Sequence, residues 1–401
     1  MALGADVASL RSPSPSELEQ SMQRGLDFLL RTQNKDGSWG SARNTKDLNI
    51  HAPVPAAHQA FRAAVTAMCI EALIETGAAD KEERAKTSLT RAEAWLLENL
   101  PKVRRADGFT IYNVWTHAYG IQALVRMHRR APQDPALQQR IRELILNQID
   151  RLRRYESVDG GWGYLDFLVG AQRPATSSIS FVSAAVLIAF HEAKSLGIEI
   201  PADLVKRAVD STERQHKRDH SYLYGEYLQW HPMMPVNRPA ASLGRSQVCN
   251  LALRLWGNTN LTDTVLTNWL DRLVSRNEWL SFGRKRPIPH ESYFQVAGYF
   301  FYFGHYYAAL CADQLEARQA RHYKSLLAAL LVPLQEKDGS WWDYPLYDYH
   351  QPYGTAFVLM TLTRCHLPAP PPRSSNAPVP PPNKDSFQSN NDEHHPEDRP
   401  K

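Results

Sequence analysis

The chain has 401 residues, of which 43% are hydrophobic, and its 46 basic and 42 acidic residues leave a formal charge of +4. This composition is ample for one large core, and no uninterrupted apolar run is long enough to span a membrane. The charge is too nearly balanced to indicate a nucleic-acid surface, so we expect no nucleic-acid partner, and any binding of a polyanion would have to be local.

The cysteines and the amino terminus carry little sign of metal binding, oxidation or secretion. The four cysteines lie inside apolar helical segments and never form a Cys-x-x-Cys pair, which favours buried thiols: Cys69, Cys249, Cys311 and Cys365. We therefore expect neither a metal ion nor another cofactor. Residues 1–6 lack a basic start followed by an apolar stretch, so a cytoplasmic location is expected, although a processed secretory form would look the same.

Three loops carry nearly the same phrase, and each stands between two apolar segments of helical period. Residues 33–40 read QNKDGSWG, residues 156–163 read ESVDGGWG and residues 335–341 read QEKDGSW. A phrase that recurs at long intervals marks a supersecondary unit too small to bury its own apolar face, so units must pack side by side. The sequence therefore predicts an array of helical hairpins around one core.

Six such units can be counted along the chain, each with a first helical segment, a polar loop and a second helical segment. The first segments of units one to three lie at 17–30, 92–97 and 141–152. Units four and five have lost the phrase, with 215–222 and 277–279 in its place. The more apolar second segments are 63–73, 114–124, 179–190, 244–253, 303–311 and 352–362.

The ends of the chain differ from this pattern. Residues 1–16 are interpreted as an N-terminal arm and residues 17–366 as a single folded domain. After Cys365 the chain becomes Pro-rich and then polar and charged. Because such a composition buries too little surface to offset its ordering entropy, residues 367–401 are predicted to form a disordered tail.

Alignment of the second segments places one residue of each unit in an equivalent position: Thr66, His117, Ser183, Ser246, His305 and Thr355. In a ring of six units, His117 and His305 would face each other from opposite walls. They are therefore not expected to share a metal ion, whose histidine ligands must each come within about 2.1 Å. Each could still act alone as an acid, a base or a hydrogen-bond donor.

The repeated phrase resembles that of the terpene cyclase and protein prenyltransferase superfamily, whose signature is Gln, three residues, Gly, one residue, aromatic. Gln33 to Trp39 and Gln335 to Trp341 match that spacing, and Glu156 to Trp162 matches with Glu in the Gln position. The resemblance covers about residues 17–366. It implies an all-α fold, an (α/α)6 toroid of six helical hairpins with an inner ring of six helices inside an outer ring of six.

The chain departs from the known chemistries of that superfamily. The cyclases that begin by protonation use an Asp-x-Asp-Asp box, which is absent from the whole sequence. For the prenyltransferase zinc site, Gly354 holds the histidine position, and no acidic residue lies between Glu291 and Asp313. The resemblance thus favours the fold and a related ligand class without supplying either catalytic set.

Candidate site residues come from the starts of the second segments, because an inner ring encloses the cavity of a toroid. Aromatic rings with polar tips gather there and suit an isoprenoid chain, a carbocation or a sugar ring equally well. Candidates for catalysis are His117, His305, Tyr112, Tyr353, Asp343 and Asp348. Candidates for ligand binding are Trp115, Tyr119, Tyr164, Arg238, Arg245, Tyr302, Tyr306, Trp342 and His350.

The topology also predicts an electropositive mouth. If the six inner helices run parallel, their positive N-termini meet at one end of the ring. Basic residues stand in the loops before these helices: Arg173, Arg238, Arg245, Arg284, Lys285 and Arg286. Pairing with nearby acidic residues, as solvated loop charges, is the alternative interpretation. Arg245 is expected to meet a phosphate or carboxylate in bidentate fashion.

Three functions remain open from the sequence. We favour a cyclase- or prenyltransferase-like toroid that binds an elongated apolar or amphiphilic small molecule with an anionic end, and whether it also transforms that molecule is left open. The second is a polysaccharide lyase or glycoside hydrolase that uses loop carboxylates, with Arg245 neutralising a uronate. The third is a non-catalytic binding or scaffold toroid. Peripheral contact with a membrane and any oligomeric state are left open.

Overall fold

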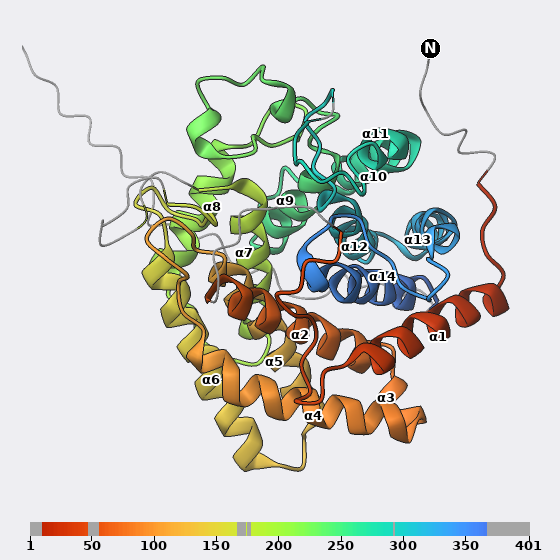
Figure 1. Cartoon of the computed structure of the whole chain (residues 1–401). Coiled ribbons are helices and arrows are strands. Elements are labelled where there is room, and N and C mark those ends of the chain that lie inside the picture. Colours follow the sequence, from red (N-terminus) through yellow and green to blue (C-terminus); the bar gives the residue numbers. More distant parts are fainter. Residues whose placement is uncertain (1–9, 47–55, 167–173, 175–177, 292, 367–401) are drawn as a thin grey trace, which may run out of the picture.

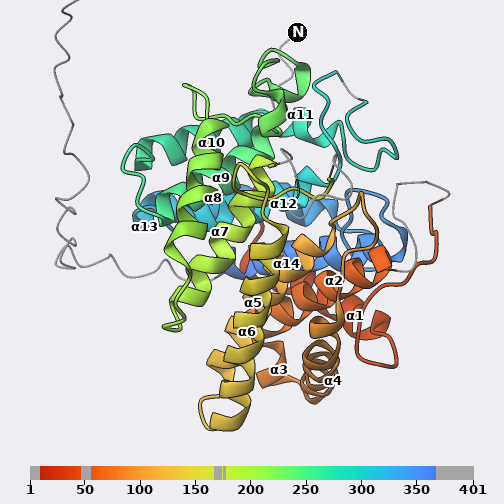
Figure 2. The same cartoon turned by 90° about the vertical axis from the view of Figure 1, so that its left-hand side faces the viewer.

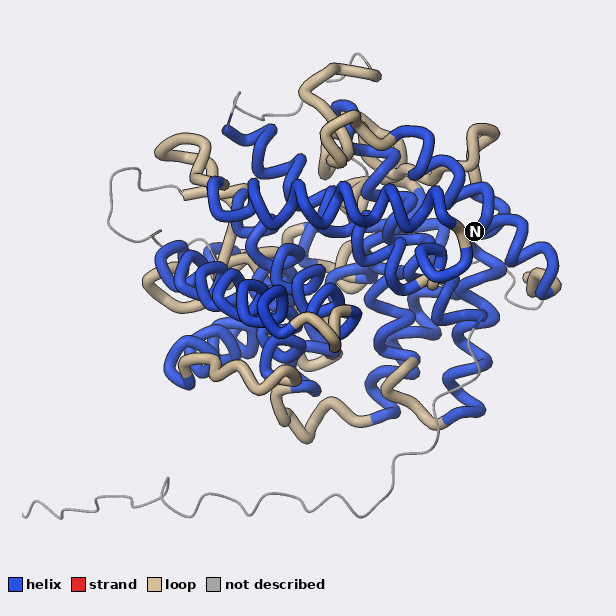
Figure 3. Tube along the Cα trace, turned by 90° about the horizontal axis from the view of Figure 1, so that it is seen from below, coloured by secondary structure: helices blue, strands red, loops and turns tan. Residues whose placement is uncertain are grey.

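The computed structural model describes residues 10–46, 56–166, 174, 178–291 and 293–366, and these residues form helices joined by loops (Figure 3). The expected tail at 367–401 lies outside the described residues, as do residues 1–9 of the expected arm. The helices are α1 Pro15–Thr32, α2 Ala56–Glu75, α3 Ala78–Lys81, α4 Glu83–Asn99, α5 Asn113–Arg130, α6 Pro135–Tyr155, α7 Ser180–Lys194, α8 Ala202–Arg214, α9 Leu243–Leu255, α10 Asp263–Ser275, α11 Asn277–Ser281, α12 Phe300–Ala312, α13 Ala317–Leu331 and α14 His350–His366.

Six of these helices form a closed inner ring. Helix α2 packs on α5, α5 on α7, α7 on α9, α9 on α12, α12 on α14, and α14 returns to α2 (Figures 1 and 2). The outer partners are α1, α4, α6, α8, α10 and α13. The prediction of an all-α toroid of six hairpins is therefore confirmed. Across the described residues, no helix combines the length and apolarity needed to cross a bilayer.

Burial separates the two rings. In α7, 12 of 15 residues are buried, whereas in its outer partner α8 only 4 of 13 are buried. A helix that is apolar all round belongs in the interior, and one with a single apolar stripe belongs on the outside. The aligned positions, from Thr66 to Thr355, all lie on inner helices.

In the three hairpins that carry it, the repeated phrase links the two helices through a tryptophan. The indole N–H groups of Trp39, Trp162 and Trp341 donate to the carbonyl oxygens of Leu29, Leu152 and Leu331, at distances of 2.8, 2.7 and 2.9 Å. The backbone N–H groups of the same tryptophans donate to the hydroxyls of Thr66, Ser183 and Thr355. Both bonds recur in every copy of the phrase, so these tryptophans are structural links between the outer and inner helix.

The phrase also joins each of these three hairpins to the next hairpin. Gln335 Nε2 donates to the carbonyl of Ser21 at 2.8 Å, and Gln33 Nε2 donates to Ser88 at the same distance. In the third unit Glu156 replaces the glutamine and accepts from the guanidinium of Arg207 at 2.7 Å. The bond from Gln335 to Ser21 links the last unit to the first and closes the ring.

The far end of the ring, at the C-termini of the inner helices, is filled by a buried cluster of charges. Arg126 Nε lies 2.7 Å from Glu75 and 3.1 Å from Glu71, and its guanidinium also pairs with Glu192. Arg364 pairs with Glu75. These residues come from α2, α5, α7 and α14, so the cluster joins four inner helices at one end. A cavity in the ring must therefore open at the other end.

Candidate functional site: an aromatic cavity in the ring

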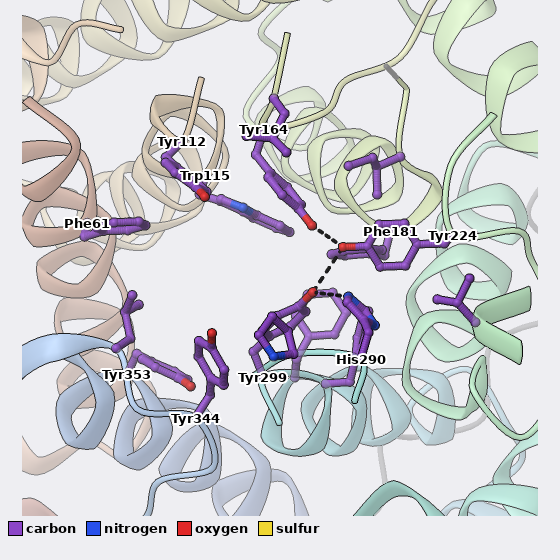
Figure 4. A pocket seen from close by; sticks show the side chains of 18 of the residues that line it. Phe61, Tyr112, Trp115, Tyr164, Phe181, Tyr224, His290, Tyr299, Tyr344 and Tyr353 are labelled. Carbon is purple, nitrogen blue, oxygen red and sulfur yellow. Dashed lines mark hydrogen bonds between the residues drawn. The ribbon is translucent and has the colours of Figure 1, made fainter. Parts of the chain in front are cut away.

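A cavity of about 700 Å³ lies inside the ring at the N-terminal ends of the inner helices. This size is within the range of small-molecule sites. Its lining is mainly aromatic and aliphatic, and Figure 4 shows the rings pointing toward one another across it. The lining residues used below are Phe61, Ala64, Met68, Tyr112, Trp115, Tyr119, Tyr164, Phe181, Tyr224, His290, Tyr299, Phe300, Phe303, Tyr344, Tyr353 and Phe357.

The lining changes from polar-tipped to apolar with depth. A belt of hydroxyl groups at the mouth comes from residues that precede the inner helices or begin them: Tyr112, Tyr164, Tyr224, Tyr299 and Tyr344. Deeper residues lie a turn or more into the helices, where each residue adds about 1.5 Å of depth. The apolar floor residues are Met68, Phe303 and Phe357, and Tyr119 adds one hydroxyl-bearing ring at this depth. The cavity is thus amphipathic along its axis.

The walls of the cavity are held by contacts between rings. Tyr112 stacks on Tyr164, with ring centroids 5.6 Å apart and planes 11° from parallel. Phe181 meets Phe300 edge to face at 4.9 Å. Such pairs add to the stability given by burial and fix the ring orientations. The rings therefore offer preformed flat faces to a ligand.

Three tyrosines and one histidine of the belt form a hydrogen-bonded chain (Figure 4). His290 Nδ1 lies 2.6 Å from the carbonyl oxygen of Gln295, and His290 Nε2 lies 3.1 Å from the Tyr299 hydroxyl. The Tyr299 hydroxyl lies 3.0 Å from that of Tyr224, which in turn bonds to the hydroxyl of Tyr164.

The direction of this chain follows from its carbonyl end. A carbonyl oxygen can only accept, so the neutral imidazole of His290 carries its proton on Nδ1 and presents a bare Nε2. Tyr299 must then donate to His290, Tyr224 to Tyr299, and Tyr164 to Tyr224. Burial lowers the pKa of His290, which keeps the ring neutral. The Tyr164 oxygen is left as a hydrogen-bond acceptor at the cavity wall.

His290 lies in a strained stretch of backbone. His290 and Gln295 have φ angles of 64° and 52°, in the left-handed region that residues with a Cβ seldom adopt. Both belong to the loop before α12. Strain of this kind persists only where the surroundings enforce it, and it clusters at functional sites. The surrounding structure therefore enforces the loop conformation that places the His290 imidazole at the mouth of the cavity.

Arg245 lies behind the cavity wall, not in it. Its side chain is fully buried, with the guanidinium 5.5 Å from the Tyr224 ring and 5.6 Å from the Phe300 ring. It donates to the carbonyl oxygens of Val236 at 2.5 Å and of Tyr222 at 3.1 Å. Burial lowers the pKa of Arg245 to about 10. The residue thus fixes the loop before α9, because its Nη1 and Nη2 groups already donate to backbone carbonyl oxygens.

Asp343 reaches the cavity only through Tyr353. Its carboxylate accepts from the backbone N–H of Tyr302 at 2.9 Å and from the hydroxyl of Tyr353, which lines the cavity. Complete burial raises the pKa of Asp343 to about 6, against the opposing effect of both hydrogen bonds. Asp343 is thus a carboxyl group with a raised pKa that is separated from the cavity by Tyr353.

The two histidines at the aligned positions connect the rings of helices. His117 Nδ1 lies 2.7 Å from the side-chain oxygen of Gln148 on α6. His305 Nδ1 donates to the carbonyl of Phe301 at 2.7 Å, and its Nε2 lies 2.7 Å from the amide of Asn277 on α11. Burial lowers the pKa of His117 to about 3 and that of His305 to about 4. Both are buried, neutral and outside the lining.

The other sequence candidates divide between the lining and its surroundings. Five of them line the cavity: Tyr112, Trp115, Tyr119, Tyr164 and Tyr353. Asp348 accepts from Ser41 at 2.9 Å, and Trp342 packs against His350, with ring centroids 5.2 Å apart. Those outside the lining, besides the four residues described above, are Asp348, Arg238, Tyr302, Tyr306, Trp342 and His350.

His290, Tyr224 and Phe181 line the cavity but were not predicted from the sequence as site residues. Unit five has no repeated phrase, so nothing in the pattern marked its loop or His290. Phe181 had a usable signal, because it stands in the first turn of an inner helix, as Trp115 does. Bulky aromatics at that position point into the ring.

The described lining offers no charged side chain to an anionic group. It contains no Lys, Arg, Asp or Glu within the ranges that the structure covers, and Arg173 lies outside those ranges. Lys285 pairs with Glu336 at 2.6 Å and Arg286 with Glu291 at 3.0 Å. The predicted anion site therefore has no side-chain cation in the described part of the cavity.

The cysteines lie in or beside the core, as the apolar segments around them predicted. Cys69, Cys249 and Cys311 are buried, Cys365 is half-buried, and all four are free thiols. Within the described ranges, no group of three or more His, Cys, Asp or Glu side chains is arranged to hold a metal ion.

Comparison with known proteins gives similarity of fold alone. No protein-family model and no curated protein matches the sequence. Among solved structures, the GH76A α-1,6-mannanase of Salegentibacter sp. HEL1_6 is similar, with a TM-score of 0.53, 8% identity, and coverage of 87% of this chain and 98% of the mannanase. An inactive variant of it, with two consecutive aspartates replaced by asparagine and α-1,6-mannotriose bound, gives a TM-score of 0.51 at 9% identity, covering 87% and 99% of the two chains.

These comparisons correct the expected family. The resemblance to terpene cyclases and protein prenyltransferases was wrong as a family assignment, because the similar structures are glycoside hydrolases of the α/α-toroid class. The physical reason is that the repeated phrase makes structural bonds between helices, and such bonds stabilise a helical hairpin whatever ligand the protein binds. The phrase therefore identifies an architecture and not a lineage.

Proposed function

We propose that the cavity binds an uncharged amphiphilic ligand, with its apolar portion on the floor and a hydroxyl-bearing portion, such as a sugar ring, at the tyrosine belt. The change of the lining from hydroxyl-tipped rings to apolar side chains with depth carries this proposal. Burial of apolar surface gives about 25 cal/mol per Å² and would supply most of the affinity. The belt would supply orientation.

The belt suits a hydroxylated head group. The Tyr164 oxygen accepts a hydrogen bond, and a ligand hydroxyl can donate one. The flat faces of Tyr112 and Trp115 can stack against the face of a sugar ring. An anionic head group would be desolvated without a charged side chain of the described lining to compensate it, which carries a large penalty. The anionic end expected from the sequence is therefore replaced here by a neutral one.

Hydrolysis by a carboxylate pair is not part of this proposal. Glycosidases use two carboxyl groups roughly 5–9.5 Å apart across the scissile bond. The described lining contains none, and Asp343 stands behind Tyr353. The inactivated mannanase variants replace two consecutive aspartates, and the present sequence contains no Asp-Asp pair.

The second candidate is a neutral oligosaccharide without an apolar chain. Its support is the fold shared with mannanases, of which one variant structure holds α-1,6-mannotetrose. Aromatic stacking serves this ligand too. The apolar floor favours the amphiphile, since Met68, Phe303 and Phe357 offer no polar group to sugar hydroxyls.

Calorimetry with three small probes separates these candidates. Monomeric octyl glucoside carries both portions, methyl glucoside lacks the chain, and octyl sulfate replaces the sugar with an anion. We expect octyl glucoside to bind at least tenfold more tightly than either of the others. Equal binding of methyl glucoside would favour the oligosaccharide, and stronger binding of octyl sulfate would refute a neutral site.

A variant that narrows the cavity tests where the octyl chain of the ligand lies. Ala64→Phe adds a ring to the cavity wall and should abolish octyl glucoside binding. Leu146→Phe makes a comparable addition on the exposed outer surface of α6, where the side chain is 51% exposed, and should bind normally. Unchanged binding by a folded Ala64→Phe protein would place the ligand elsewhere.

A further inference from the structure

Large apolar side chains are exposed at one end of the toroid. Of the nine that are exposed among the described residues, seven lie in two loop segments, 225–242 and 281–299, of which residue 292 lies outside the described residues. Trp230, Met233 and Tyr293 are 80%, 76% and 78% exposed. Single exposed apolar residues are ordinary, but a gathering of this kind marks an interaction surface. The seven are Tyr227, Trp230, Met233, Met234, Phe282, Ile288 and Tyr293.

These two loops are also the walls of the cavity mouth. Leu228, Met234 and Val236 of the first loop line the cavity, as do Pro289, His290 and Gln295 of the second. The first loop is green and the second teal in Figures 1 and 2, and in both views they project from the same end of the toroid. The exposed surface is therefore continuous with the cavity lining.

The chemistry of the loops matches a lipid surface. Residues 227–238 contain no acidic side chain, and their charge-bearing residues are His231 and Arg238. Trp and Tyr, with an apolar body and a polar tip, prefer the boundary between hydrocarbon and water. Nearby acidic groups are neutralised, since Glu226 pairs with Arg214 and Glu291 with Arg286. No net negative charge of these loops opposes approach to a phospholipid head group.

We propose that the loops 225–242 and 281–299 dock on the surface of a lipid bilayer, so that an amphiphile passes between the membrane and the cavity. This inference rests on the proposed function for its ligand. The docked side chains lie around the mouth, and the mouth leads to the tyrosine belt and the apolar floor. An amphiphile can then move from bilayer to cavity without exposing its chain to water, which would otherwise cost about 0.8 kcal/mol per CH₂ group.

Flotation of the full-length protein with phosphatidylcholine vesicles tests the docking. The wild-type protein is expected to float with the vesicles, and added phosphatidylserine should change this little. The combined variant Trp230→Ser/Met233→Ser/Ile288→Ser/Tyr293→Ser should partition at least tenfold more weakly. Among single changes, Met233→Ser should weaken flotation, and Leu146→Ser, an equally polar change at an exposed site on α6, should not.

Two further measurements separate the alternatives. The combined variant should keep its melting temperature and its octyl glucoside affinity, because the changed side chains point outward. Wild-type protein that stays in the soluble fraction, or a combined variant that floats normally, would overturn the docking. A lipid-free dimer in analytical ultracentrifugation that the combined variant dissociates would instead assign the surface to a second copy. Flotation of a wild-type protein that does not bind octyl glucoside would refute the proposed ligand but would still support the docking surface.

Discussion

The hydroxyl of Tyr299 lies 3.1 Å from Nε2 of His290, on the ring whose Nδ1 is committed to the carbonyl of Gln295. This relationship orients three tyrosine hydroxyls in one direction and leaves the Tyr164 oxygen as an acceptor. The cavity thus selects for a ligand group that donates a hydrogen bond. An ether or a carbonyl oxygen at that point would face another acceptor.

The first prediction concerns Tyr164. Tyr164→Phe keeps the ring that stacks on Tyr112 and removes the acceptor, so octyl glucoside affinity should fall roughly tenfold, or about 1.4 kcal/mol, as for one hydrogen bond. Tyr323→Phe is the matched control, because its hydroxyl bonds to Asp271 at 2.9 Å on the outer layer. If calorimetry gives both variants the octyl glucoside affinity of the wild type, the hydrogen-bonded tyrosine chain does not contact the ligand.

The second prediction is that binding weakens in acid as His290 takes up a proton. Burial lowers the pKa of His290 below its ordinary value of 6.5, and the positive charge of Arg245 lowers it further. The protonated ring would donate from Nε2 to Tyr299 and reverse the chain, while Gln295, Tyr224 and Tyr299 offer no negative charge to hold the proton. Affinity should be flat above pH 6.5 and decline below the pKa. A His290→Gln variant, which cannot take up that proton, should lose this decline.

The third prediction links Asp343 to stability. Its pKa is about 6 in the folded protein against an ordinary 3.8, so between these values the native state holds a proton that the unfolded state has released. Raising the pH through this window therefore destabilises the fold, by up to about 3 kcal/mol. Asp343→Asn reproduces the protonated form, since its amide oxygen can accept from Tyr302 and its NH₂ can donate to Tyr353.

Denaturant unfolding of the wild type and of Asp343→Asn at several pH values measures this pH dependence of stability. The variant should equal wild type near pH 4 and exceed it by up to about 3 kcal/mol at pH 7. Taking the difference between the proteins cancels the buried histidines His117 and His305, whose lowered pKa values act in the opposite sense. A constant difference from pH 4 to 7 would mean that Asp343 titrates normally.

The fourth prediction concerns the ion cluster that fills the far end. Arg126→Met leaves Glu71, Glu75 and Glu192 buried together without Arg126, and removing one partner of a buried ion pair typically costs about 3–5 kcal/mol. Acid should restore part of the loss by protonating the carboxylates. Lys206→Met, which breaks an exposed pair with Asp210, should change the unfolding free energy by less than about 1 kcal/mol.

The fold could be predicted from sequence because its signal is periodic and repeated. The bonds from Trp39, Trp162 and Trp341 recur in each copy, so three phrases implied a hairpin array. The site was only partly predictable. Tyr112 and Trp115 were found because they stand at the start of an inner helix, where the ring has its cavity.

The rest of the site depends on side-chain direction and burial, which spacing does not encode. Arg245 stands one residue before the aligned position of its unit, yet its guanidinium turns away to backbone carbonyls. His117 and His305 are on inner helices but face the outer layer. His290 lies in a loop of irregular backbone, where periodicity carries no information.

The last prediction uses two glycines that share a backbone conformation. Gly339, in the repeated phrase of the last unit, has φ +89°, and Gly257, in the loop after α9, has φ +93°. A Cβ at Gly339 would overlap the carbonyl oxygen of Arg24 on α1, whereas a Cβ at Gly257 would meet nothing within 4 Å. The two positions therefore differ in the close approach of a neighbouring helix and not in strain.

Alanine at each position separates the two effects. Gly257→Ala should cost only the left-handed strain, about 1–2 kcal/mol. Gly339→Ala adds a clash at the contact that joins the last hairpin to the first, and should cost roughly 2 kcal/mol or more beyond that. Denaturant unfolding of the two variants measures the difference. Equal losses would mean that the first and last hairpins separate easily at this contact and that the ring is held closed mainly by its inner helices.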